Sequence, residues 1–98
     1  MKVTILDAAE RDLEEGFRFY ERQSPGLGAY FLDSLYSDID SLAYYGGIHQ
    51  LVFGHHRLLS RRFPFAVYYQ AAKDRVLVVA VLDCRRNPSW IRKKLMPD

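Results

Sequence analysis

Two apolar runs rich in β-forming residues, Phe63–Tyr69 and Val76–Leu82, constrain the fold more than any other stretch of the chain. They flank the short polar pair Lys73-Asp74, and two such runs around a short polar break predict a β-hairpin. Val76–Leu82 is apolar on both faces of the predicted strand. This pattern is typical of a central strand that is covered on both sides. We therefore expect helices against one face and the C-terminal tail, or a partner, against the other.

The register of this hairpin bears on four arginines. A two-residue loop at Lys73-Asp74 pairs Ala72 with Arg75. Continued without interruption, the same register opposes two pairs of arginines, Arg62 with Arg85 and Arg61 with Arg86. Like charges that face each other across strands are destabilising, so this placement points to an anionic ligand outside the fold. The alternative is that arginine simply ends the strands and extends its long side chain into water.

The charges of the chain are unevenly distributed. The net charge of the 98 residues is +2, but residues 1–45 hold four basic and nine acidic groups, whereas residues 46–98 hold ten basic and three acidic groups. The two halves therefore carry −5 and +7. A basic half of this strength favours an anionic partner, either a phosphate backbone or an acidic protein segment.

Length and composition set further bounds. The length predicts a single domain over residues 1–98, and 49% hydrophobic and 14% aromatic residues are typical of a folded chain. No apolar run approaches the roughly 20 residues of a membrane span. The single cysteine, Cys84, excludes an internal disulfide, so we expect a cytoplasmic protein. Cys84 has no evident catalytic partner in the sequence, and we do not expect it to act as a nucleophile.

The first half of the chain predicts one strand and two helices. Lys2–Leu6 is β-prone, and Asp7 with Glu10 has the spacing of a capping box at the start of a helix that runs to about Arg22. Ser24-Pro25 is typical of the start of a second helix. Its apolar stripe consists of Leu27, Phe31, Leu35, Ile39 and Leu42, and Gly46-Gly47 ends it. The short break predicts an antiparallel helical hairpin.

The second half predicts strands and a basic tail. Ile48–Phe53 is either a short strand or a packed loop, and Arg57–Arg62 is a candidate strand. Pro64 cannot donate to a ladder and marks a strand start, a bulge or an edge. The residues after Arg86, which include Trp90, form a short basic helix or arm. The pattern indicates a small α+β domain: a strand, two helices, an antiparallel meander and a basic tail.

Histidines are the remaining candidates for chemistry. Adjacent residues of a strand point to opposite faces, so His55 and His56 cannot readily share one metal ion, and we expect no metal site. Either could act as a general base near neutral pH, or lie at the surface without a catalytic role. The sequence contains no phosphate-binding glycine loop, nucleotide fingerprint or nucleophile elbow, so we expect no cofactor.

Three motifs in order resemble the RelE/ParE superfamily of toxins from type II toxin–antitoxin systems, a group that includes plasmid stabilisation proteins. They are Tyr20–Gly26, the residues from Arg57 to Tyr69 with Arg61-Arg62-Phe63-Pro64-Phe65, and Asp83–Trp90. The resemblance implies the order β-α-α-β-β-β(-α), with an antiparallel sheet packed on a helical hairpin. It also implies a bacterial growth inhibitor that a cognate antitoxin neutralises.

The resemblance leaves two mechanisms open. One branch of the superfamily cleaves mRNA on the ribosome without a metal; Arg57 and either Arg85 or Arg86 match its basic positions. The arginine that this branch carries on its second middle strand is replaced here by Ala66, and the position of its tail tyrosine is nearest Trp90. The loss of an acid–base group typically lowers the rate of catalysis by about 10²–10⁴. His56 or His55 would have to substitute.

The other branch resembles ParE, which poisons DNA gyrase and has no catalytic set. The chain looks closer to it, so the sequence favours a binding toxin, with an endoribonuclease or an inactive binding-only member as alternatives. The expected target- or anion-binding residues are Arg57, Arg61, Arg62, Arg85, Arg86 and Trp90.

Overall fold

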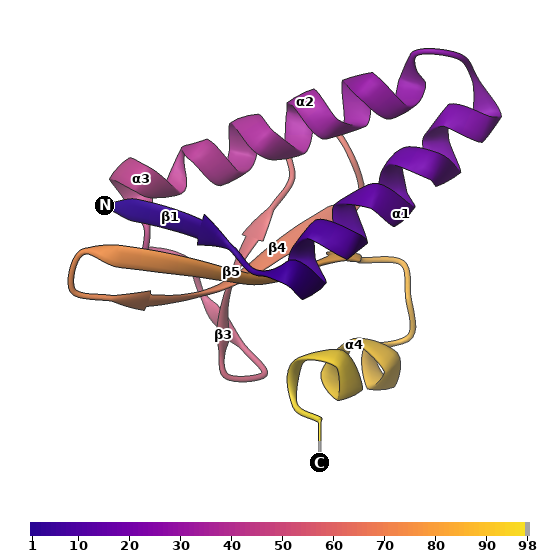
Figure 1. Cartoon of the computed structure of the whole chain (residues 1–98). Helices are drawn as coiled ribbons and strands as arrows, with labels where there is room; N and C mark the ends of the chain where they lie inside the picture. The colour runs from indigo at the N-terminus through magenta and orange to yellow at the C-terminus, as the bar shows by residue number, and fades with distance from the viewer. Residues whose placement is uncertain (98) are drawn as a thin grey trace.

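A five-stranded sheet in the order β1-β5-β4-β3-β2 organises the computed structural model, which describes residues 1–97 (Figure 1). The elements are β1 (Lys2–Ile5), α1 (Asp7–Gln23), α2 (Leu27–Asp40), α3 (Leu42–Tyr45), β2 (Leu51–Val52), β3 (His55–Leu59), β4 (Phe65–Ala72), β5 (Arg75–Asp83) and α4 (Pro88–Leu95). The α+β fold and the helical hairpin predicted from the sequence are confirmed.

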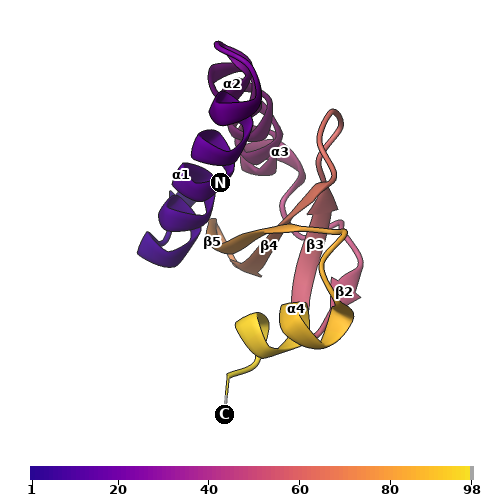
Figure 2. The same ribbon diagram turned by 90° about the vertical axis from the view of Figure 1, so that its right-hand side faces the viewer.

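The sheet has a different cover on each face. Helices α1 and α2 pack on one face and α4 lies against the other (Figure 2). In β5, Val76 and Val78 belong to the core beneath the helical hairpin. Leu82 packs with Ile91 and Leu95 of α4 in a second core. The prediction that this strand is covered on both faces, with the tail on one of them, is confirmed.

Strand β1 differs from the antiparallel sheet that we expected. It pairs in parallel with β5, from Lys2 opposite Arg75 to Ile5 opposite Val78, while the other strand pairs are antiparallel. Two parallel strands need a long crossover connection between them. Here the helices and the strands β2 to β4 form that connection. Since β1 ends at Ile5, it covers only the first half of β5.

The β4–β5 hairpin begins in the predicted register and then leaves it. Ala72 pairs with Arg75, as the two-residue loop requires. Between Tyr69, opposite Val78, and Tyr68, opposite Ala80, β5 advances by two residues while β4 advances by one. This β-bulge at Val79 shifts every later pair and exchanges the faces of the following side chains.

Both helix starts differ in detail from the sequence prediction. Asp7 is the first residue of α1 and makes no capping hydrogen bond, because the N-cap position is Leu6. Helix α2 begins at Leu27 rather than after Ser24, and its N-cap, Gly26, has a φ of 88°. This left-handed conformation suits glycine, which has no Cβ to clash. The second helix also divides, since α3 forms a separate turn after α2.

Candidate functional site

The predicted opposition of four arginines across the hairpin is wrong. Strand β4 begins at Phe65 and β5 ends at Asp83, so neither pair takes part in the ladder. Arg61 and Arg62 lie exposed in the segment before β4, and Arg85 and Arg86 lie exposed in the turn after β5. The bulge would in any case have displaced the register by one residue.

The guanidinium group of Arg85 is paired with a carboxylate of the same chain. Its Nε and Nη2 donate to the two oxygens of Asp83, at 3.0 and 2.8 Å, and its backbone N–H donates to the same side chain. The hydrogen bonds from Arg85 hold the pKa of Asp83 below its usual range. Such a paired guanidinium has less capacity for an external anion than a free one.

Arg86 is held by an aromatic ring instead. Its guanidinium lies 4.3 Å from the centroid of Trp90, and the Lys94 ammonium lies 5.3 Å from the same ring. Within residues 1–97, Arg86 forms no ion pair. Stacking fixes the plane of a guanidinium while leaving its N–H groups free to bind a carboxylate or phosphate.

Arg57 lies on the sheet face that α4 covers. It is opposite Tyr68 in the β3–β4 ladder, and Tyr68 belongs to the core beneath α4. Burial raises the pKa of Tyr68, and the Arg57 guanidinium opposes this shift. Burial likewise raises the pKa of the Cys84 thiol, which keeps the thiol protonated at neutral pH. The sequence pattern did not identify Tyr68 as a site residue, because it is one aromatic residue within an apolar run.

His56 lies on the opposite face of the sheet from Arg57. Its ring stacks on Tyr69, with centroids 5.1 Å apart, and Tyr69 belongs to the core beneath the helical hairpin. Its Nδ1–H donates to the carbonyl oxygen of His49 at 2.6 Å. The Tyr69 hydroxyl in turn accepts from the Gly47 N–H and contacts His49 Nδ1. His56 is therefore part of a packed network on the other face from Arg57.

His55 shares the face of Arg57, because alternate residues of a strand point to the same side. Its Nδ1–H donates to the carbonyl oxygen of Phe53 at 3.0 Å, which directs Nε2 away from that contact. Of the two histidines, His55 is the one that could reach a ligand bound beside Arg57.

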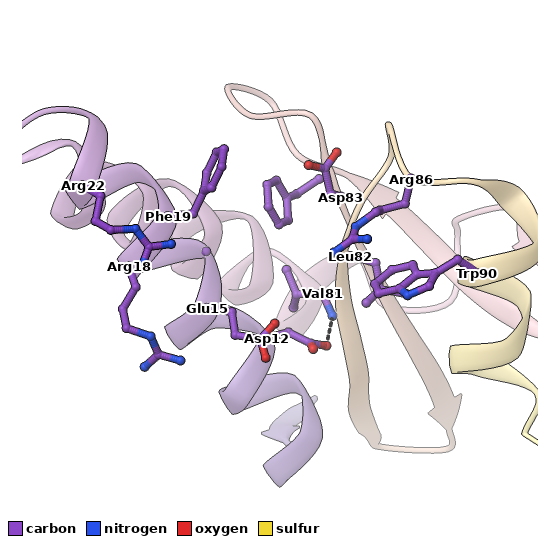
Figure 3. Close-up of a pocket in the computed structure, with 12 residues that line it drawn as sticks. Asp12, Glu15, Arg18, Phe19, Arg22, Val81, Leu82, Asp83, Arg86 and Trp90 are labelled. Atoms are coloured by element: carbon purple, nitrogen blue, oxygen red, sulfur yellow. Dashed lines mark hydrogen bonds between the residues drawn. The ribbon is translucent and has the colours of Figure 1, made fainter.

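A groove lies between α1 and the end of β5 (Figure 3). It has a volume of about 590 Å³ and is walled by α1 on one side and by Val81–Asp83, Arg86 and Trp90 on the other. We call it the α1–β5 groove. In it, the Asp12 carboxylate accepts a hydrogen bond of 2.9 Å from the Val81 N–H. Burial raises the pKa of Asp12 to about 6.

Several of these features can contribute to the binding of an anion. Free guanidinium groups, a stacked tryptophan and a groove can hold an anionic chain. Within residues 1–97, no three His, Cys, Asp or Glu side chains gather in a way that could hold a metal ion. None of the described helices is both long and apolar enough to span a bilayer.

The architecture places the chain in the class of ParE-like α+β folds. It is similar to a chain of the solved chromosomal ParDE TA system from P. aeruginosa, with a TM-score of 0.71 over 83% of this chain and 92% of that chain. The two sequences are 17% identical, so the likeness is one of fold. No family model matches the sequence, and no curated protein matches it significantly.

Proposed function

We propose that this chain is the toxin component of a type II toxin–antitoxin module. It inhibits growth by binding DNA gyrase in the manner of ParE, and a cognate antitoxin neutralises it. The observation that carries the proposal is the likeness of fold to a chain of a ParDE TA system, which extends over 83% of this chain. The three sequence motifs that resemble the superfamily support the same reading.

The placement of the candidate catalytic residues favours a binding toxin over a nuclease. His56 and Arg57 point to opposite faces of the sheet, and Arg85 is paired with Asp83. General acid–base catalysis needs its groups within hydrogen-bond reach of one substrate. The two residues from β3 cannot serve the same phosphate group, whereas a protein-binding toxin has no such requirement.

Expression of the chain in bacteria, with a gyrase readout beside a translation readout, tests the proposal. We expect growth arrest with changed plasmid supercoiling and intact mRNA, and co-expression of the neighbouring small reading frame should relieve it. Arrest with cleaved mRNA and unchanged supercoiling would overturn the gyrase mechanism. Harmless expression without antitoxin would instead indicate an inactive, binding-only member.

One observation favours the alternative of a ribosome-dependent endoribonuclease. Arg57 lies opposite the buried Tyr68 on the face that also carries His55, which brings a cation, a phenol and an imidazole to one side of the sheet. In that case, Arg85→Ala combined with Arg86→Ala should abolish mRNA cleavage. Cleavage that persists in the double variant would exclude the roles expected of these two arginines.

The antitoxin interaction has an electrostatic component in this proposal. Residues 46–98 carry a net charge of +7, and Tyr30, Tyr44 and Tyr45 expose 47%, 84% and 58% of their surface. An acidic amphipathic chain that folds onto the toxin would match both features. The association rate should fall as salt is added, because screening weakens electrostatic steering. A rate independent of salt would contradict this part of the proposal.

A further inference from the structure

The segment between β3 and β4 is closed at both of its ends. Its residues 61–64, which we call the β3–β4 loop, extend from the sheet toward the helical layer (Figure 2). At the base of the loop, the Ser60 N–H donates to the Phe65 oxygen at 2.8 Å. The Cys84 N–H, which follows β5, donates to the Pro64 oxygen at 2.8 Å. The backbone of the loop is therefore tied to the sheet where it leaves and where it returns.

Phe63 anchors the second half of the loop in the helical layer. Its ring makes edge-on contacts with Tyr20 of α1 and Phe31 of α2, at centroid distances of 4.9 and 5.2 Å. The ring of Tyr30, also from α2, lies 5.5 Å away. Edge-to-face aromatic pairs add to the free energy of burial, so these contacts hold Phe63 in place.

Asp38 of α2 anchors the residue before the loop. Its Oδ2 accepts a hydrogen bond of 2.8 Å from the Ser60 hydroxyl. Asp38 is only 7% exposed, and within residues 1–97 it forms no ion pair. Burial of a carboxylate is costly unless it is hydrogen-bonded, and a hydrogen bond to a charged acceptor is stronger than a neutral one. The contact therefore holds Ser60 firmly against α2.

The face of α2 under the loop carries one further polar residue. Tyr30, Ser34 and Asp38 follow each other at intervals of four residues, which places them on one face of the helix. The two outer residues contact Phe63 and Ser60. Ser34, between them, is 5% exposed, and its hydroxyl forms no hydrogen bond within the described residues. Asp38 thus supplies the polar contact, and Ser34 offers a matched control.

Two arginines lie between the two anchors. Arg61 and Arg62 separate Ser60 from Phe63, and both side chains are exposed. Within residues 1–97, neither forms an ion pair. A free guanidinium can bind a carboxylate through two hydrogen bonds. Because the residues on each side are fixed, less conformational entropy is lost when the two arginines bind a ligand.

We propose that Asp38 is a positioning residue of the toxin: through Ser60, it holds the β3–β4 loop in the conformation in which Arg61 and Arg62 bind carboxylates of the target protein. The inference rests on the proposed function and adds to it a buried residue that does not touch the target. Asp38 acts by keeping the binding-competent conformation populated, and loss of that population weakens binding in proportion.

The first arm of the test measures the order of the loop in the purified chain. Backbone order parameters from ¹⁵N relaxation should be about 0.85 for Arg61 and Arg62 in the wild type, and below about 0.6 in Asp38→Ala and Ser60→Ala. Asp38→Asn keeps an acceptor oxygen and should keep the loop ordered. Ser34→Ala should also leave it unchanged. A loop that stays ordered in Asp38→Ala and Ser60→Ala would overturn the positioning role.

The second arm measures the cellular level of the chain, by immunoblot, that gives half-maximal growth arrest. Asp38→Ala and Ser60→Ala should each raise this level about fivefold. Arg61→Ala combined with Arg62→Ala should raise it about tenfold, because two solvent-accessible contacts are lost. Asp38→Asn, Ser34→Ala and the exposed Asp40→Ala should behave like the wild type.

The combination of Asp38→Ala with both arginine substitutions separates positioning from a general effect on the fold. If Asp38 acts through the two arginines, the triple variant should need the same level as the arginine double variant, about tenfold above the wild type. A level about fiftyfold above the wild type would show independent effects and overturn the inference. A wild-type chain that arrests no growth would instead contradict the proposed function, and with it the role of the loop in toxicity.

Discussion

The carboxyl group of Asp12 links α1 to the edge of β5 at a position where burial disfavours its charged form. It accepts the Val81 N–H at 2.9 Å, yet burial raises its pKa from 3.8 to about 6. A carboxyl group whose pKa is higher in the folded state than in the unfolded state favours folding when protonated. Its contribution is complete below about pH 4 and is lost as the pH rises through about 6.

Asp12→Asn should therefore stabilise the protein more at pH 7 than at pH 4. Asparagine keeps an acceptor oxygen for Val81 and carries no charge, so the gain at pH 7 is on the order of 1 kcal/mol after allowance for the partial exposure of the site. Urea unfolding of both proteins between pH 4 and pH 8 measures the difference. A difference that does not change with pH would contradict the raised pKa.

Gly16 of α1 packs against the ring of Phe31 from α2. A Cβ built there would lie 2.4 Å from Cζ of Phe31, whose side chain is completely buried. Gly16→Ala gains helix propensity of about 1 kcal/mol but forces the packed ring to move, at a cost of roughly 1–3 kcal/mol. We expect a net loss of unfolding free energy in urea titrations. Arg11→Ala, on the exposed face of the same helix, is the control and should change stability little; a Gly16→Ala protein as stable as wild type would contradict this packing.

At the scale of the element, one side chain organises the turn between the two long helices. The Glu21 carboxylate accepts hydrogen bonds from the N–H groups of Gly26, at 3.0 and 3.1 Å, and Gly28, at 2.9 Å. It thereby supplies the acceptor that a serine or aspartate at the N-cap normally provides, while Gly26 supplies the left-handed backbone.

Glu21→Ala should therefore destabilise the helical hairpin by about 1–2 kcal/mol, as the loss of a helix cap does. Glu21→Gln keeps one acceptor oxygen and should lose about half as much. Unfolding free energies of the two variants provide the measurement, with the exposed Glu14→Ala as the matched control. Equal stability of Glu21→Ala and Glu14→Ala would mean that the turn does not depend on this carboxylate.

The helices and strands also show which features could be predicted from the sequence and which could not. Local signals identified both helices, the Lys73-Asp74 loop and the two-sided burial of β5. The Glu21 cap was missed because it reaches five and seven residues forward, outside the local capping pattern. The bulge was missed because Val76–Leu82 is apolar throughout, so no polar residue marks the change of face. The predicted pairing of the arginines failed for a further reason, because β4 begins at Phe65 and β5 ends at Asp83, before either pair is reached.

At the scale of the whole molecule, the two charge classes follow the two halves of the chain and the elements that each half forms. The acidic first half forms β1 and the helical hairpin, while the basic second half forms the remaining strands and α4. The sequence predicted this division, but not the groove in which Asp12 meets the end of β5. That juxtaposition depends on the parallel pairing of β1, a long-range contact that no local pattern encodes.

A supercoiling assay with purified DNA gyrase tests the proposed toxin function most directly. Titration with the wild-type chain should inhibit supercoiling, and a variant with Arg57, Arg61, Arg62 and Arg86 changed to alanine should inhibit it far less at equal concentration. The Arg75→Ala chain serves as a control and should inhibit like the wild type. If the wild-type chain arrests growth when it is expressed, but the purified chain leaves supercoiling unchanged even at saturating concentration, the gyrase mechanism is contradicted.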